Sequence, residues 1–211
     1  VALWLLREKK LGSTVAMVAL VVILIGDMYP VNKRYLNSGN FVTAARKTNP
    51  FPMTEADRYI LQDKDMNYRV LNAAAGPTLA ASFNEPRTSY YHKSVGGYHA
   101  AKLRRYQEMI DHHIMPEMQE TYQAVATAGG QMDSVDASKF RVLNMLNTKY
   151  FIFPAGEQGQ AVPVVNPYAY GNAWFVDKVQ YVNNANEEID ALNDILPTET
   201  AVVDVKFKEQ L

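Results

Sequence analysis

The sequence predicts an α+β domain with a mainly antiparallel sheet and packed helices, preceded by an N-terminal hydrophobic, transmembrane-like helix. An uncharged run from Leu11 to Gly26 lies near the start of the chain. Helix-period patterns cluster in residues 103–146, and strand-like runs lie on both sides of that cluster. The chain has 211 residues, 48% of them hydrophobic, which is enough for a substantial core. We expect residues 1–30 to be membrane segment with a short basic loop, and residues 31–211 to be one extracytoplasmic domain.

Charge and cysteine content exclude several classes of function. The formal net charge is −1, whereas broad nucleic-acid binding needs a basic surface that neutralises phosphates. The sequence has no cysteine, so disulfides, thiol nucleophiles and thiolate metal sites are excluded within it. The composition predicts a folded protein with no nucleic-acid partner, and it does not assign a compartment.

The N-terminal segment resembles a membrane span. Residues 15–25 are all Val, Ala, Met, Leu or Ile. The uncharged run spans roughly 24 Å as a helix, slightly less than a ~30 Å hydrocarbon core. The basic residues before it predict a short cytoplasmic loop, so residues after about Asp27 would lie outside the cytoplasm. The apolar block Val1–Leu6 precedes those charges, and we therefore expect a segment of a longer protein. The alternative is a buried helix or strand of a soluble core.

Local patterns predict the elements of the remaining chain. Thr54-x-x-Asp57 resembles a capping box that begins a short helix ending near Leu61. Pro116 suits the first turn of a helix, and Gly129-Gly130 is typical of a helix end. The other expected elements are a strand at 68–71, helices at 103–114, 116–128, 136–146 and 187–196, a strand at 149–153, a β-rich run at 174–182 and a strand at 201–207.

The densest group of ligand-type residues lies in the loop that follows residue 83. Aromatic faces cover the apolar faces of sugars, while Arg, Lys and Asn donate hydrogen bonds to oxygens. We expect Gly96-Gly97 to precede a helix directly and to offer backbone N–H groups to an anion. The alternative is a loop whose tyrosines pack on the domain's own core. The candidate binding residues are Asn84, Arg87, Tyr90, Tyr91, Lys93, Gly97, Tyr98 and Lys102.

Other chemistries have little support in the sequence. His112 and His113, with Glu117 nearby, are residues of the types that bind metal ions. Adjacent residues of a helix point about 100° apart, however, so the two histidines do not face one site, and we predict no metal site. No G-x-S-x-G turn occurs, so a serine hydrolase lacks its nucleophile motif. Paired carboxylates such as Asp63 and Asp65 lie in polar segments and are expected to be solvated. No cofactor is predicted, and no catalytic residue is assigned.

Four segments follow one another in a characteristic order. They are Ile25-Gly-Asp-Met-Tyr-Pro-Val-Asn-Lys-Arg-Tyr-Leu36, Tyr90-Tyr91 followed by Gly97-Tyr98 and Arg105-Tyr106, Asn144-Met-Leu-Asn-Thr-Lys-Tyr-Phe-Ile152, and Asn166-Pro followed by Gly-Asn-Ala-Trp174-Phe-Val. In order and spacing they resemble the YfhO family of bacterial polytopic membrane proteins, in the version found in Bacteroidetes. The resemblance covers most of residues 26–176.

The resemblance implies a plasma-membrane glycosyltransferase of the GT-C type, which transfers a sugar from a lipid-phosphate carrier to an acceptor on the outer face. The catalytic acid of such proteins lies in an early outer loop, which this segment does not include. The expected partners are the rest of its own membrane domain, a lipid-phosphate sugar and an envelope glycan acceptor. Arg87, Lys93 and Lys102 would face phosphate, and the three tyrosines of the loop would stack on sugar.

Two alternatives remain open at this stage. One is a non-catalytic envelope binding or assembly domain that uses the same loop to hold a partner or polymer. The other is a soluble hydrolase, which would require residues 1–26 to be part of its core. A truncation that begins near Asn32 would misfold in the hydrolase and stay folded in an anchored domain.

Overall fold

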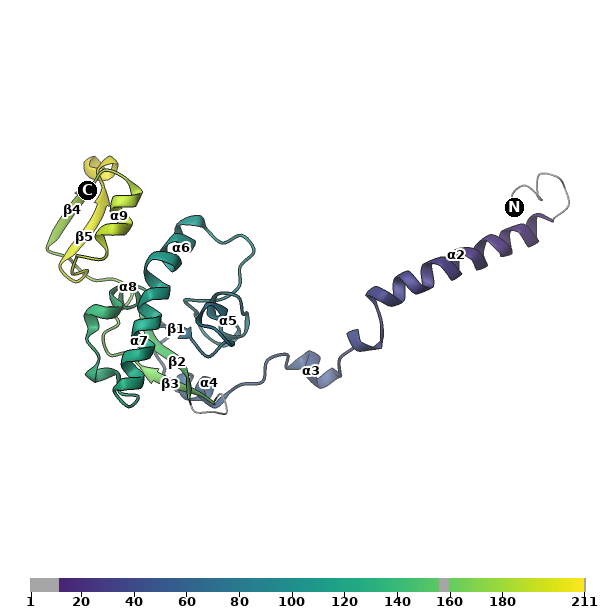
Figure 1. The fold of residues 1–211 in the computed structure, drawn as a ribbon, viewed down its shortest axis with the longest axis horizontal. Coiled ribbons are helices and arrows are strands. Elements are labelled where there is room, and N and C mark those ends of the chain that lie inside the picture. Colours follow the sequence, from purple (N-terminus) through teal and green to yellow (C-terminus); the bar gives the residue numbers. More distant parts are fainter. Residues whose placement is uncertain (1–11, 156–159, 211) are drawn as a thin grey trace. The chain divides into compact units, whose positions relative to one another are not determined.

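The computed structural model describes residues 12–155 and 160–210 (Figure 1). The chain divides after Pro50 into two compact units. The first contains the long helix α2 (Ser13–Tyr35), the turn η1 (Ser38–Asn40) and the short helix α3 (Ala44–Thr48). The second begins at Phe51 and contains every strand of the described residues. The predicted class, α+β with an N-terminal apolar helix, is confirmed.

Helix α2 carries the apolar run predicted from the sequence. Its side chains are largely exposed, with Val22 at 62% and Ile25 at 61%. Within Ser13–Asn40, an 18-residue window has a mean hydropathy of 2.1, so by length and composition this helix is able to cross a membrane. A signal sequence meets the same criteria. Pro30 lies inside the helix and has no N–H to donate to the carbonyl of Gly26.

The main sheet has the strand order β1-β2-β3, with β1 at Arg69–Asn72, β2 at Thr148–Ala155 and β3 at Gln160–Val165. Strand β1 pairs with β2 in parallel, whereas β2 pairs with β3 antiparallel. The expectation of a mainly antiparallel sheet is therefore wrong, because the helices between β1 and β2 return the chain in the same direction. Strand β3 was not predicted, and Pro163 stands within it, as an edge strand tolerates.

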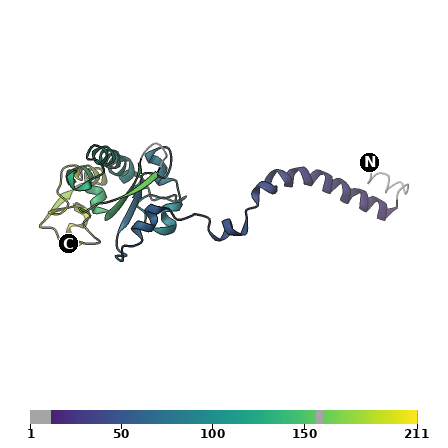
Figure 2. The same ribbon diagram turned by 90° about the horizontal axis from the view of Figure 1, so that it is seen from below.

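Both faces of this sheet are covered by other elements (Figure 2). Successive side chains of β2 point to opposite faces of the sheet, and residues 150–153 are all buried. Phe151 and Phe153 pack with the helices of the middle of the chain in the larger hydrophobic cluster. Tyr150 and Ile152 belong to a second cluster, which includes Ile60 of helix α4 (Glu55–Ile60). The capping box predicted at Thr54 and Asp57 is confirmed at the start of α4.

The predicted helices at 103–114 and 116–128 follow each other without a break. Helix α6 (Arg104–Met109) continues through the π-helical segment η3 (Ile110–Ile114) into α7 (Met115–Thr127). Pro116 lies in the first turn of α7, and Gly129 and Gly130 follow its end with φ of 66° and 91°. The remaining elements before β2 are η2 (Leu79–Phe83), α5 (Arg87–Tyr91), η4 (Met132–Ser134), η5 (Ala137–Phe140) and α8 (Arg141–Met145).

Residues 173–210 form a further group of elements, here called the C-terminal module. It consists of β4 (Lys178–Val182), α9 (Ala185–Ala191), β5 (Thr200–Asp204) and η6 (Val205–Gln210). Strands β4 and β5 pair in parallel, with α9 as the crossover between them. The strand predicted at 201–207 ends at Asp204, three residues earlier than expected, and residues 205–207 belong to η6 instead. The rest of the second unit, residues 51–155 and 160–172, is called the domain body.

Candidate functional site

The predicted binding loop lies around the short helix α5. The guanidinium of Arg87 donates to the carbonyl of Pro52 at 2.8 Å. The hydroxyl of Tyr91 donates to the carbonyl of Phe51, and the Tyr90 ring lies edge-on to the Phe51 ring at 5.5 Å between centroids. Three of the predicted residues thus fix the segment where the second unit begins.

The other polar residues of the loop also bond within the domain body. Lys93 donates to the carbonyl of Met66 at 2.5 Å, and Asn84 donates to the carbonyl of Ala80 at 3.3 Å. Lys102 donates to the side chain of Gln107 and lies 5.7 Å from the ring centroid of Phe83. Tyr90 and Tyr98 are 53% and 64% exposed, so their rings remain open to a ligand.

The expected anion site at Gly96-Gly97 needs a correction. The next helix, α6, begins at Arg104 rather than directly after the glycines. The N–H of Gly97 donates to the carbonyl of Ser82 at 2.7 Å, and that of Gly96 donates to the hydroxyl of Ser94 at 3.0 Å. These glycines serve a close backbone approach, because a Cβ at Gly96 would lie 2.2 Å from the carbonyl oxygen of Ser82.

A buried acid–histidine pair, missed in the sequence, lies beneath this loop. Nε2 of His92 is 3.0 Å from Oδ1 of Asp57, and their side chains are 1% and 7% exposed. Burial raises the pKa of Asp57, but hydrogen bonds from Thr54 and His92 outweigh it, so this pKa lies below its usual value. Nδ1 of His92 has no partner among the described residues. Without solvent access, the pair joins α4 to the end of α5 and does not reach a ligand.

The segment 144–152, which carries part of the family resemblance, is largely structural. The amide of Asn166 donates to Oδ1 of Asn144 and to the carbonyl of Thr148, both at 2.8 Å. Asn147 takes a left-handed conformation with φ of 56°, which asparagine tolerates better than most residues. This segment ends helix α8 and begins β2, so its asparagines stabilise a buried turn.

Lys149 and Tyr150 meet the predicted carboxylate pair. Asp63 lies 2.6 Å from Nζ of Lys149 and accepts a hydrogen bond from the hydroxyl of Tyr150 at 2.7 Å. The Lys149 hydrogen bond leads the causes that lower the pKa of Asp63 to about 2. The Lys149 ammonium also lies 5.6 Å from the Tyr68 ring centroid. The expectation that Asp63 is simply solvated is wrong, since an ion pair holds it.

The histidines of α6–α7 lie beside a small polar cavity of about 170 Å³ that includes Glu117. Both carboxylate oxygens of Glu117 accept backbone N–H groups, from Val142 and Leu143, at 2.9 Å each. Burial raises the pKa of Glu117 to about 7 in spite of these bonds. Nε2 of His113 is 2.8 Å from the carbonyl of Ile189. Across residues 12–155 and 160–210, no group of three His, Asp or Glu side chains is placed to hold a metal ion.

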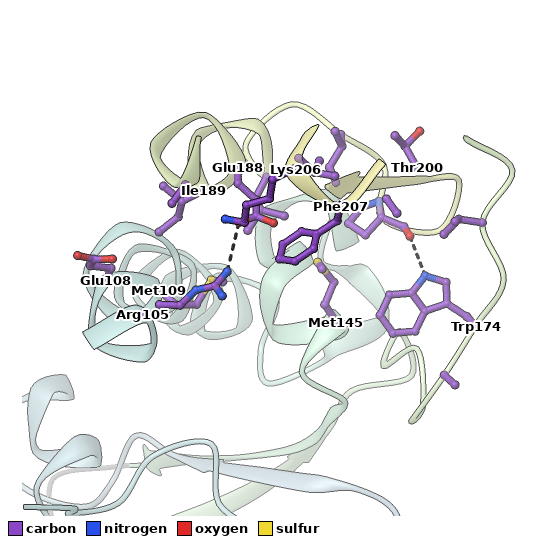
Figure 3. Close-up of a pocket in the computed structure, with 18 residues that line it drawn as sticks. Arg105, Glu108, Met109, Met145, Trp174, Glu188, Ile189, Thr200, Lys206 and Phe207 are labelled. Atoms are coloured by element: carbon purple, nitrogen blue, oxygen red, sulfur yellow. Dashed lines mark hydrogen bonds and ion pairs between the residues drawn. The ribbon is translucent and has the colours of Figure 1, made fainter. Parts of the chain in front are cut away.

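A larger cavity lies where the C-terminal module meets helices α6 and α8 (Figure 3). Its volume is about 700 Å³, within the range of small-molecule and peptide-anchor sites. The wall is mainly apolar and includes Phe207 of the C-terminal module and Met145 of α8 (Figure 3). The other apolar wall residues are Met109, Ala173, Trp174, Val176, Ala185, Ile189, Leu192, Ile195, Pro197, Ala201 and Val202.

Two polar contacts fix opposite sides of this cavity (Figure 3). On one side, Arg105 of α6 pairs with Glu188 of α9 at 3.2 Å. On the other, the indole N–H of Trp174 donates to the carbonyl of Pro197 at 2.7 Å. The sequence offered one unused signal for this cavity: Ala185, Ile189 and Leu192 recur at helical spacing and form an apolar stripe.

Comparison with known proteins adds no assignment to this geometry. No protein-family description, no curated protein and no solved structure matches the chain.

Proposed function

We propose that the chain is the extracytoplasmic domain of a YfhO-like integral membrane protein in the bacterial plasma membrane. The parent protein would be a GT-C-type glycosyltransferase that uses a lipid-phosphate-linked sugar, with this domain serving acceptor or donor binding and not catalysis. The observation that carries the proposal is the exposed apolar helix α2, followed by a folded α+β domain. The order of the family-like segments supports the choice of family.

The binding face we propose is the surface around α5. Tyr90 and Tyr98 offer exposed rings for a sugar. Arg87 and Lys93 bond to carbonyls on the domain surface, and a phosphate would compete for them with a charge-assisted bond stronger than one to a neutral carbonyl.

The test is sugar transfer by the full-length parent carrying Arg87→Ala and Lys93→Ala together. We expect transfer to fall at least about tenfold, the effect of losing roughly 1.4 kcal/mol of binding, with an unchanged thermal unfolding profile. Arg104→Ala is a matched control, because this side chain is 91% exposed and its ion pair within the described part of the chain is with Glu108, one turn away. Full transfer by the double variant, or equal loss in the control, would contradict this site.

A second candidate is a non-catalytic domain for envelope binding or assembly. The large cavity favours it, since an apolar recess suits a partner at least as well as a sugar. The two functions differ in the parent protein: a transferase loses sugar transfer when its early acidic outer loop is neutralised, whereas an assembly protein shows no transfer before or after that change.

A further inference from the structure

The large cavity is open to a ligand, and the four charged side chains that line it are already paired. Arg105 is paired with Glu188, and Lys206 is paired with Asp204 at 2.6 Å. Glu108 accepts a hydrogen bond from Arg104 at 2.8 Å. Because each charged residue of the rim already has a partner in the domain, what enters the cavity is recognised through its apolar groups.

The C-terminal module, which supplies most of the cavity wall, carries an excess of acidic residues. Residues 173–210 contain eight Asp or Glu residues against three Lys and no Arg. Most of the acidic side chains are exposed, among them Asp177, Asp190 and Asp194. A surface with this excess repels anionic ligands and attracts cationic ones over roughly a Debye length, about 10 Å at 0.1 M salt.

Further apolar side chains are exposed directly next to wall residues in the chain. Phe175, next to Trp174, is fully exposed at 100%, and Leu196 and Val205 are 53% and 45% exposed. Met109 and Met145 line the wall itself, and methionine adapts readily to the shape of a bound apolar group. Helices bind such recesses through apolar residues at i, i+3, i+4 and i+7.

We propose that the cavity and the acidic C-terminal module dock a basic amphipathic helix of a partner protein. The partner's apolar face would fill the recess between α6, α9 and Phe207, and its Lys or Arg residues would face the acidic surface of the C-terminal module. Charge complementarity favours this occupant over a fatty acid or an anionic phospholipid, whose head group would be repelled by the acidic module. The inference does not depend on the glycosyltransferase proposal, because it concerns a different face.

Trp174 provides the measurement, since it lies in the cavity wall. The sequence has two tryptophans, so Trp4→Phe in the full chain leaves Trp174 as the only indole. The protein is held in nanodiscs of phosphatidylcholine and titrated with a 14-residue Leu/Lys amphipathic helix. Two further probes are a peptide of the same composition in scrambled order, and a Leu/Glu helix with the same apolar face.

We expect the Leu/Lys helix to shift the Trp174 emission and to bind at least about tenfold tighter than either control peptide, a difference of roughly 1.4 kcal/mol. Ala201→Phe, which fills the cavity, should weaken binding about tenfold or more. Asp190→Lys should weaken it several-fold at low salt and hardly at high salt. Asp133→Lys, an exposed change outside the module, is the matched control and should leave binding unchanged.

Four results would overturn the proposal. Equal binding of the scrambled peptide would show that the cavity does not recognise the apolar face of a helix. Equal binding of the Leu/Glu helix would show that the charge of the peptide does not matter. If Asp133→Lys weakened peptide binding as much as Asp190→Lys does, the effect would come from the net charge of the protein and not from the C-terminal module. Quenching of Trp174 by a dibrominated fatty acid at concentrations where the Leu/Lys helix does not bind would make the cavity a lipid site instead. If Ala201→Phe unfolds, Asp190→Lys against Asp133→Lys still decides the matter, because both changes are on the surface.

Discussion

The domain body and the C-terminal module are both built from strands and helices, yet they bury their strands very differently. In the body, β2 has five of its eight residues buried, and each face of the sheet is covered by its own cluster. In the module, β4 and β5 form a parallel pair with one buried residue each. Parallel strands normally occur in sheets covered on both faces. We therefore expect the body to be the more stable of the two, with the module leaving apolar surface available for binding.

The largest expected effect compares one residue type in the two regions. Ile152 in β2 is 2% exposed, and Ile195 in the module is 7% exposed beside the large cavity. Replacing a buried isoleucine by alanine costs about 2–5 kcal/mol, depending on how far the site can relax. We expect Ile152→Ala to lie near the upper end and Ile195→Ala near the lower end, measured by denaturant unfolding. Equal losses would contradict the proposed difference.

The next effect concerns Glu117, which ties α7 to α8 within the body. Its pKa is raised from 4.5 to about 7. The unfolded chain releases this proton near pH 4.5 and the folded one near 7, so this group's contribution to stability falls as the pH rises between those values. The slope is at most about 1.4 kcal/mol per pH unit. Glu117→Gln should remove this dependence, and an unchanged slope would be the contrary result.

Asp57 gives the opposite pH dependence. Its folded pKa lies below the usual value of 3.8, so its stabilising contribution is present above that value and is lost as the pH falls through the folded pKa. Asp57→Asn should cost about 1–3 kcal/mol at neutral pH by weakening a buried hydrogen-bonded pair, and the difference from wild type should shrink in acid. Thermal melts at pH 3 and pH 7 measure both. A difference that grows in acid would contradict this account.

The smallest effect is expected at the ion pair that joins the module to the body. The Arg105 side chain is 83% exposed, and exposed ion pairs contribute about 0–1 kcal/mol. Arg105→Ala should therefore change the free energy of unfolding by less than about 0.5 kcal/mol. A much larger loss would mean that this contact, and not apolar packing, holds the module in place.

The sequence predicted local features well and pairings poorly. The capping box at Thr54, the glycine end of α7 and the strand at 149–153 were found because each depends on residues close in the chain. The direction of β1 against β2 joins residues nearly eighty positions apart, and no local pattern encodes it. Strand β3 was missed because Pro163 interrupts an otherwise apolar run.

The same limit applies to the candidate sites. Arg87, Tyr91 and Lys93 were chosen for their chemistry, but the sequence does not show that backbone carbonyls of Pro52, Phe51 and Met66 lie within reach. The large cavity was missed because its wall comes from α6, α8 and the C-terminal module, which are distant in the chain. His92 and Asp57 are 35 positions apart and meet only in the fold.

The most direct test of a membrane-anchored outer domain uses the absence of cysteine from the sequence. Single-cysteine variants Tyr98→Cys and Lys9→Cys of the 211-residue chain are exposed, in intact spheroplasts, to a membrane-impermeant maleimide. The account predicts labelling of position 98 in intact spheroplasts, and labelling of position 9 only after lysis. Labelling of position 98 only after lysis would place the domain inside the cell and contradict the central claim.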